Sequence, residues 1–373
     1  MAINKEQNKL NVPHLRFPEF QGEWEKCKLG DIAEFSTARV SSVKLDCKNY
    51  VSTENMLQDF QGVVEAKSVP NETNVISFTC GDILISNIRP YLKKVWKATF
   101  DGGCSSDVFV LQATDTVAKD YLHYAVANDK FINYVMSGAK GVKMPRGDKN
   151  QMRTYQLSLP SIQEQYKIAK LLTLLDERIA TQSKLIEKLE SLIKGLRVSL
   201  MQIENGNIVH LGEIARIYQP QTISSTELTE DGFLVYGANG IIGKYKEYNH
   251  KTEQICITCR GNTCGMVNYT KPMSWITGNA MVINTDEHQN KVCKRYLYHY
   301  LSAYNFNSII SGSGQPQIVR TPLEKLEITL PSIFEQEQKA MLLDRIQAKI
   351  EISNRVLSLY QEQKQYLLRQ MFI

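Results

Sequence analysis

A stripe of apolar residues at alternating steps of three and four runs through one long segment and then recurs near the end of the chain. The first copy comprises Leu172, Leu175, Ile179, Gln182, Ile186, Leu189, Ile193, Leu196 and Leu200. A shift of 171 residues gives Leu343, Ile346, Ile350, Ser353, Leu357, Tyr360, Lys364, Leu367 and Met371. The first polar interruption, Gln182 or Ser353, falls at the same step in both copies. We call these positions the seam. Two long helices with such stripes are predicted to pack on each other as a coiled coil.

Both predicted helices start in the same way. Each copy opens with Leu-Pro-Ser-Ile, at Leu159–Ile162 and Leu330–Ile333. Serine followed three residues later by glutamate predicts a capping box, formed by Ser161 with Glu164 and by Ser332 with Glu335. The first helix leads into the segment between the two copies, and the second helix leaves that same segment. The pair is therefore expected to run antiparallel.

The segments in front of the two helices also repeat. Leu29-Gly30-Asp31-Ile32-Ala33 corresponds to Leu211-Gly212-Glu213-Ile214-Ala215. Short runs rich in β-branched residues follow each opening, and each unit then has one predicted helix, at residues 120–136 and 295–310. Such self-similarity predicts a tandem duplication.

The expected fold is α+β, with two mixed α/β domains at opposite ends of an antiparallel two-helix coiled coil and an approximate two-fold axis between the halves. The expected parts are an irregular N-terminal arm (1–28), a first domain (29–159), a central helix (160–202), a second domain (203–329) and a C-terminal helix (330–373). Gln182 and Ser353 are expected to help set the register of the coil.

Composition favours a folded, cytoplasmic protein. Of the 373 residues 43% are hydrophobic and 22% are charged, values typical of soluble domains. The sequence has no run of 18 apolar residues and no secretory signal, which argues against a membrane location. Eight scattered cysteines are expected to be reduced thiols.

Enzyme motifs are weak. Residues 237–244 resemble a phosphate-binding loop, but the glycine spacing is one residue too long and Tyr245 replaces the magnesium-binding hydroxyl. Cys256 and Cys259 lie on a predicted strand, where offsets of three point to opposite faces, so they are expected to be structural. The histidines and carboxylates show no spacing typical of a catalytic or metal site. We therefore predict a binding protein, with no catalytic residue, no metal and no cofactor of its own.

Clusters of basic side chains indicate what is bound. Each unit is close to neutral, with 15 basic and 14 acidic side chains at residues 29–159 and 11 against 10 at residues 211–330. The cations gather beside glycines, which suits contacts to duplex phosphates, although any one cluster could equally be a solvated basic face. Amide and guanidinium groups before the second long helix are of the types that read base edges. The candidate DNA-binding residues are Arg89, Lys93, Lys94, Lys140, Lys143, Arg146, Lys149, Lys244, Arg260, Gln315, Gln317 and Arg320.

With these features the chain resembles the specificity subunits of type I restriction–modification enzymes. The resemblance rests on the Trp24–Ala33 opening and the paired Leu-Pro-Ser-Ile helices. In the second unit it also rests on residues 235–243, 276–280 and 311–317. The first unit departs more, at residues 91–95 and 138–141.

This resemblance implies a non-catalytic subunit for defence against foreign DNA, in which each domain is a target recognition domain for half of a bipartite target. The coil would act as a ruler for the spacer. Two modification subunits would bring S-adenosylmethionine for adenine methylation, and two restriction subunits would use ATP and Mg for cleavage. The main alternative is a protein–protein scaffold without a nucleic-acid role, which would show no salt-sensitive binding to duplex. A third possibility is an enzyme with an unfamiliar active site.

Overall fold

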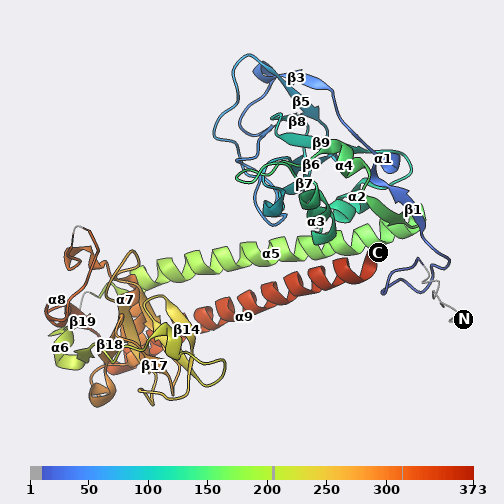
Figure 1. Cartoon of the computed structure of the whole chain (residues 1–373). Helices are drawn as coiled ribbons and strands as arrows, with labels where there is room; N and C mark the ends of the chain where they lie inside the picture. The colour runs from blue at the N-terminus through green and yellow to red at the C-terminus, as the bar shows by residue number, and fades with distance from the viewer. Residues whose placement is uncertain (1–10, 204–205, 313) are drawn as a thin grey trace, which may run out of the picture. The chain divides into compact units, whose positions relative to one another are not determined.

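The computed structural model describes residues 11–203, 206–312 and 314–373, and the chain divides into two compact units. Unit 1 holds the residues up to Thr181 together with Leu357–Ile373, and unit 2 holds Gln182–Val356. Figure 1 shows the helices and strands of each unit in chain order. Each unit therefore combines one mixed domain with parts of both long helices.

The first domain is built from three small sheets, whose orders are β1-β10, β2-β9-β6-β7 and β3-β5-β8-β4. All pairings are antiparallel except that of β4 with β8. The strands are β1 Glu25–Lys28, β2 Ala33–Phe35, β3 Arg39–Ser41, β4 Tyr50–Val51, β5 Asn74–Phe78, β6 Ile83–Ser86, β7 Val95–Lys97, β8 Gly102–Cys104, β9 Val108–Ala113 and β10 Gln156–Leu159. The helices are α1 Leu29–Ile32, α2 Lys119–Val126, α3 Asp129–Ser137 and α4 Lys149–Arg153, with the 3-10 turns η1 Ser42–Lys44 and η2 Pro90–Leu92.

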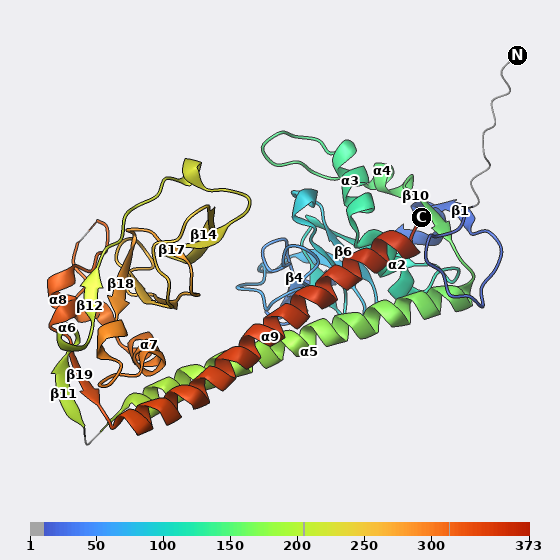
Figure 2. The ribbon, with the colours of Figure 1, turned by 90° about the horizontal axis from the view of Figure 1, so that it is seen from below.

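The second domain repeats the central part of this plan. Its sheets have the orders β11-β19, β12-β18-β15-β16 and β14-β13-β17, and Figure 2 shows β11 beside β19. The strands are β11 Asn207–His210, β12 Arg216–Tyr218, β13 Phe233–Gly237, β14 Gly240–Tyr245, β15 Ile255–Thr258, β16 Val267–Tyr269, β17 Trp275–Ile276, β18 Ala280–Asn284 and β19 Glu327–Leu330. The helices are α6 Leu211–Ile214, α7 Lys294–Ala303 and α8 Arg320–Glu324, with η3 Ser225–Glu227, η4 Asp286–His288 and η5 Phe306–Ser308. The segment that resembled a phosphate loop is the β13–β14 hairpin.

Three expectations about the arm and the domain helices were wrong. The single helix expected at residues 120–136 is two helices, because the Asn128 side chain accepts from Phe131 N to cap α3 and donates to the carbonyls of Tyr124 and Ala125. The helix expected at residues 295–310 ends as α7 at Ala303 and is followed by η5. The arm at residues 1–28 is not irregular throughout, since it ends in β1; its first ten residues lie outside the described part of the chain.

The two long helices are α5 Ile162–Met201 and α9 Ile333–Met371. All seam residues are buried or half-buried. In unit 1, Leu172 and Leu175 share one apolar cluster with Leu367 and Met371. In unit 2, Ile193 clusters with Leu343 and Ile350.

Within each unit the two helices run antiparallel. In unit 1 the early part of α5 meets the late part of α9, and in unit 2 the late part of α5 meets the early part of α9. The predicted fold class, α+β with two mixed domains and a pair of long antiparallel helices, is confirmed.

The starts of the two long helices differ in one respect. Glu335 forms the predicted capping box, since its carboxylate accepts from Ser332 N at 3.2 Å and its own N–H donates to Ser332 Oγ at 3.3 Å. Glu164 N likewise donates to Ser161 Oγ at 3.4 Å. The carboxylate of Glu164, however, accepts two bonds of 2.8 Å from Arg16 instead. The full box predicted for the first helix was therefore wrong, because the arm supplies a guanidinium that binds the buried carboxylate.

A buried glutamine fastens each domain to its long helix. Gln165 and Gln336 are each 1% exposed. Their Oε1 atoms accept from Ala118 N and Cys293 N, each at 2.8 Å. Their Nε2 atoms donate to the carbonyls of Thr116 and Pro160 in the first copy, and of Lys291 and Pro331 in the second. The contact is made in the same way in both halves, yet the side-chain type alone gave no sign of it.

Replacing either glutamine with alanine removes these bonds and leaves buried backbone groups unsatisfied, at about 1–3 kcal/mol for each group. We expect Gln165→Ala to destabilise unit 1, and Gln336→Ala to destabilise unit 2, by about 2–4 kcal/mol in denaturant unfolding. The exposed neighbours Gln163 and Gln338 are matched controls, whose alanine variants should be close to neutral. Equal effects of the buried and the exposed glutamines would contradict this role.

The polar pair in the seam makes one bond. Gln182 Nε2 donates to the carbonyl of Ser353 at 3.0 Å, and Ser353 is 2% exposed. A carbonyl inside a helix also accepts from the amide four residues later. Losing Gln182 therefore leaves no orphaned acceptor on the partner helix.

We accordingly expect Gln182→Leu to leave the melting temperature unchanged or to raise it by up to about 2–4 °C. The exposed Gln361 of α9 provides the control, because Gln361→Leu changes propensity without burying a leucine. A clear fall for Gln182→Leu alone would show that the amide makes a bond that the coil needs.

Candidate functional site

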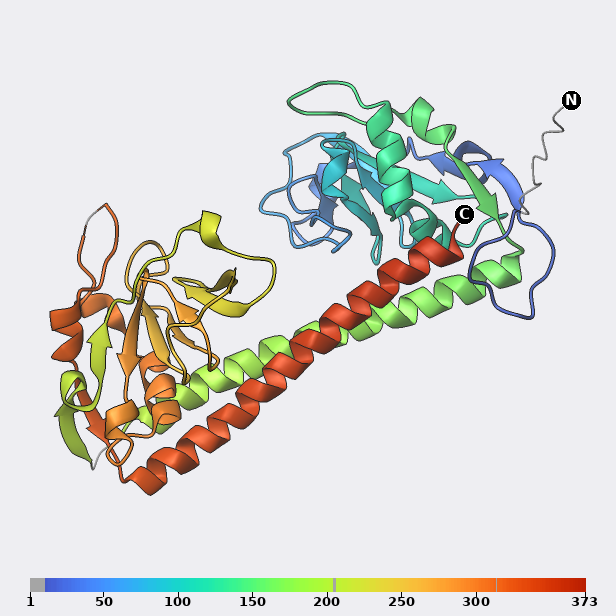
Figure 3. The same cartoon turned by 60° about the horizontal axis from the view of Figure 1, so that its bottom comes forward.

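A loop between α3 and α4 in the first domain closes into a short hairpin. Lys140 and Arg146 exchange two backbone hydrogen bonds, of 3.0 and 2.9 Å. Gly141 has a φ of +95°, a left-handed conformation that glycine adopts without steric cost. Figure 3 shows this loop extending from α3 and α4.

The second domain forms the same hairpin before α8. Ser311 and Gln317 exchange bonds of 2.9 and 2.8 Å, and Gly312 has a φ of +93°. A Cβ at Gly312 would lie 2.4 Å from the carbonyl of Gln315, and a Cβ at Gly141 would lie 3.2 Å from that of Met144. Gly141 therefore corresponds to Gly312. Ser313, within the segment 311–317 that contains the candidate residues Gln315 and Gln317, lies outside the described residues.

Each hairpin is fastened to the loop that follows an inner strand of a four-stranded sheet, β6 in the first domain and β15 in the second. In the first domain, Arg89 N donates to Pro145 O at 2.8 Å and Gly147 N donates to Asn87 O at 3.0 Å. In the second domain, Gly261 N donates to Pro316 O at 2.9 Å and Ile318 N donates to Cys259 O at 3.0 Å. We call each hairpin with its partner loop a paired-loop site. The backbone of the two sites is the same, although their side chains differ.

The first paired-loop site brings together most of the cations predicted for that domain. Lys140, Lys143 and Arg146 are exposed on the hairpin. Lys140 Nζ lies 3.8 Å from an Asp148 oxygen, and Arg146 lies 3.3 Å from an Asp107 oxygen. Exposed pairs of this kind are worth little, so these cations remain available to an anionic ligand.

Three other predicted cations of this domain have partners that restrict them. Lys93 Nζ lies 2.8 Å from Asp129 Oδ1. Lys94 Nζ donates to Thr53 O at 2.6 Å, and burial, followed by the charge of Arg89, lowers the pKa of Lys94. Lys149 Nζ lies 4.7 Å from the centroid of the Phe109 ring, and burial lowers the pKa of its amine. Lys94 and Lys149 thus have structural contacts that sequence clustering did not reveal.

The second paired-loop site contains Arg260, Gln315 and Gln317, because the backbone of Arg260 pairs with Gln317. Arg320 opens α8 directly after the hairpin, and its Nε donates to Glu324 Oε1 at 2.7 Å. Lys244 lies apart, on β14 in another sheet, where its Nζ is 3.5 Å from Asp231. The structure therefore assembles four of the five residues predicted for this domain.

Sequence reasoning missed Thr263 in the second site and Asn239 beside it. Thr263, in the loop that follows β15, hydrogen-bonds through its hydroxyl to Asn239 at the turn of the β13–β14 hairpin. The signal was present as Ala238-Asn239 between two glycines, within a segment that resembles both a phosphate loop and the family's recognition domains, but Asn239 itself was not predicted to be a site residue.

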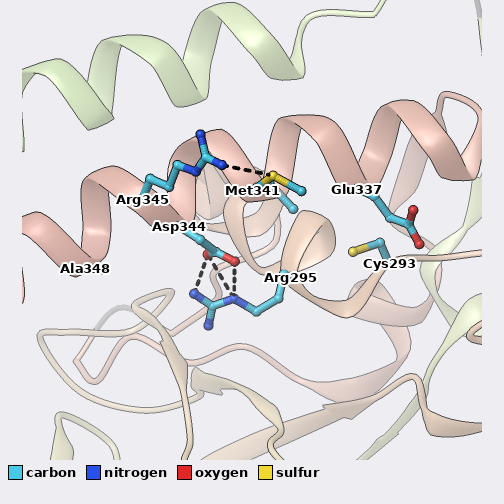
Figure 4. Close-up of a pocket in the computed structure, with 8 residues that line it drawn as sticks. Cys293, Arg295, Glu337, Met341, Asp344, Arg345 and Ala348 are labelled. Atoms are coloured by element: carbon cyan, nitrogen blue, oxygen red, sulfur yellow. Dashed lines mark hydrogen bonds and ion pairs between the residues drawn. The ribbon is translucent and has the colours of Figure 1, made fainter.

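An open surface pocket of about 410 Å³ lies where α7 meets α9. Figure 4 shows Arg295 and Asp344 bonded to each other inside it. Burial would raise the pKa of Asp344, but bonds from His299 and Arg295 hold that pKa below its ordinary value. His299 is 0% exposed; its Nε2 lies 2.8 Å from Asp344, and its Nδ1 accepts from Arg197 of α5 at 3.2 Å. Arg295, His299 and Asp344 therefore join α7 to the long helices within unit 2.

The cysteines also serve structure. Cys256 and Cys259 belong to different apolar clusters on opposite faces of the sheet, and burial raises the pKa of the Cys256 thiol. Across the described residues, we find no group of histidine, cysteine and carboxylate side chains able to hold a metal ion. Within the same part of the chain, no helix is both long and apolar enough to cross a membrane.

Comparison with known proteins gives one consistent family. The family model for the type I restriction modification DNA specificity domain matches twice, at residues 21–191 and 204–359. The specificity subunit of the type I restriction enzyme MjaVIII from Methanocaldococcus jannaschii is 24% identical, covering 95% of this chain and 92% of its own. The EcoprrI specificity subunit of Escherichia coli is 33% identical over 36% of this chain and 34% of its own.

A solved structure has the same fold. The crystal structure of the type I restriction–modification S subunit from M. genitalium superposes with a TM-score of 0.71 at 17% identity, covering 97% of this chain and 99% of that one. The two family matches fall on the two halves that share the paired-loop site, and together they span most of the sequence. The chain therefore belongs to the family of type I restriction–modification specificity subunits.

Proposed function

We propose that this chain binds duplex DNA at a bipartite target, with each paired-loop site reading one half. The observation that carries the proposal is the repetition of one backbone arrangement with different side chains. A protein that reads two unlike half-sites needs one scaffold presented twice with variable contacts, and the two hairpins supply that.

The chemistry of the hairpins supports the same proposal. Lys140, Lys143 and Arg146 in the first site suit phosphate contacts, and an arginine can also bind guanine through two bonds. Gln315 and Gln317 in the second site are of the type that pairs with adenine. Both left-handed glycines, Gly141 and Gly312, hold the turn that presents these side chains.

The long helices are proposed to set the distance between the two halves of the target. A helix of 40 residues is about 60 Å long at about 1.5 Å per residue. This equals under roughly 18 base pairs of duplex at about 3.4 Å each. Within each unit the two helices pair in antiparallel fashion, and such pairing would make a spacer stiffer than a single helix.

We propose that the chain itself is not catalytic and acts in the cytoplasm with partners. Two modification subunits would bring S-adenosylmethionine for adenine methylation, and two restriction subunits would bring ATP and Mg. One solved structure with the same fold, at a TM-score of 0.54 and 18% identity, comes from work on complex assembly and conformational transition of the type I R-M system. That likeness concerns the fold, and family membership supports the proposed partners.

The proposal is tested by mapping methylated adenines in a host that carries this chain and its modification partner. We expect a target of two defined halves with an undefined spacer. Gln317→Ala should relax preference in one half only, by about 1–3 kcal/mol if a base contact is lost. Lys143→Ala should weaken binding to all duplexes alike, with a smaller salt dependence.

Lys143 serves as the comparison because it lies on the equivalent hairpin with no partner among the described residues. If both variants changed affinity in the same way on every sequence, the assignment of reading to Gln317 would be wrong. If the wild-type chain showed no salt-sensitive binding to duplex, a scaffold would be favoured.

A further inference from the structure

Arg89, in the first paired-loop site, holds a backbone conformation that its chemistry disfavours. Its φ and ψ are +51° and +61°, a left-handed region in which the Cβ of an L-residue is crowded. The next residue, Pro90, further disfavours helical backbone angles at the residue before it. Strain of this kind persists only where the surroundings impose it, and it is often found at functional positions.

The second domain has a glycine at the equivalent position. Gly261 donates its N–H to Pro316 as Arg89 does to Pro145, and its φ is +89°. The backbone must therefore bend here to hold the hairpin, and glycine achieves this without a side chain. Because glycine is sufficient for this bend, the backbone conformation does not explain why the first domain has an arginine here.

The Arg89 side chain has no structural role within the described part of the chain. It is exposed, and no hydrogen bond or ion pair joins it to another described residue. By contrast Lys93, the other basic residue of this loop with a left-handed backbone conformation, is paired with Asp129. Arg89 is the cation of this loop that is free to bind a ligand.

The surroundings of Arg89 are strongly positive. Residues 87–94 and 140–149 carry seven cations and one carboxylate. Asp129 and Asp107 lie against Lys93 and Arg146, so the net charge of the group is +4. The equivalent residues 259–266 and 311–320 carry only two cations, of which Arg320 is paired with Glu324. The charge of Arg89 itself contributes to lowering the pKa of Lys94, after burial. An anion between these groups would relieve their repulsion.

We propose that Arg89 is a DNA phosphate contact, kept in a strained backbone conformation for that purpose, and that the first domain supplies most of the salt-dependent binding. The second domain, with Gly261 and Gly265 at the left-handed positions, instead allows its backbone to approach the duplex. This inference rests on the proposed function and adds to it an unequal division of labour between the two domains.

The test uses the full chain and duplexes that contain the target sequence identified by mapping adenine methylation. Arg89→Gly should raise the melting temperature by about 2–4 °C, because strain is relieved. It should also reduce the slope of log affinity against log salt by about 0.9, the value for one phosphate contact. Arg89→Gln keeps the strain and removes the charge, so the slope should fall by the same amount with no gain in melting temperature.

The reciprocal variant is Gly261→Arg, where a Cβ meets nothing within 4 Å. It should lower the melting temperature and steepen the slope by about 0.9. A lower melting temperature in Arg89→Gly would show that the side chain is structural and overturn the proposal, as would unchanged slopes in both Arg89 variants. Failure of the wild-type chain to bind duplex would instead overturn the proposed function itself.

Discussion

The antiparallel pairing of α5 and α9 is the interaction on which both units depend. Neither helix has a wide apolar face of its own, and long helices in water derive most of their stability from packing. Leu367 and Met371, near the C-terminus, complete the apolar cluster that contains Leu172 and Leu175. Unit 1 therefore needs residues from the C-terminal end of α9, and the second domain lies between the two long helices in sequence.

The packing of each domain on its long helix explains why the two halves share backbone contacts but differ in side chains. Gln165 and Gln336 fasten each domain to its helix through equivalent hydrogen bonds, because the junction has to be rebuilt identically at each copy of the helix. The paired-loop sites lie outside that junction. Their hairpins share backbone bonds and a left-handed glycine, while the side chains at the tip differ almost completely. Under the proposed function, the DNA contacts could therefore change there without disturbing the packing.

Much of the fold could be predicted from the sequence because the apolar periodicity of the two long helices extends over many residues. A periodicity sustained over two helices of 40 and 39 residues outweighs local ambiguity. Shorter elements were harder: β8 is Gly102–Cys104, and glycine-rich strands carry little β-propensity. The break at Asn128 depends on a side-chain cap, which competes with helix continuation only in the folded context.

The candidate site was predictable only in part, because charge clustering does not reveal which amines are already engaged. Lys94 and Lys149 lie among the predicted cations, yet one binds a carbonyl and the other lies over an aromatic ring. The correspondence between Lys140–Arg146 and Ser311–Gln317 was hidden because almost no side chain is shared. It emerges from backbone bonds, which the sequence does not display.

The most direct test of the central claim, that the paired helices set the spacing of the target, is to lengthen both. Duplicating Ser183–Ile186 in α5 together with Lys349–Ile352 in α9 adds about 6 Å and about one turn to each helix, which returns the stripe near its original face. Methylation of a plasmid library with both half-sites at every spacer length would then be mapped. The account predicts unchanged half-sites and a preferred spacer longer by one to two base pairs, at about 3.4 Å per pair. Full activity with the original spacer would contradict it.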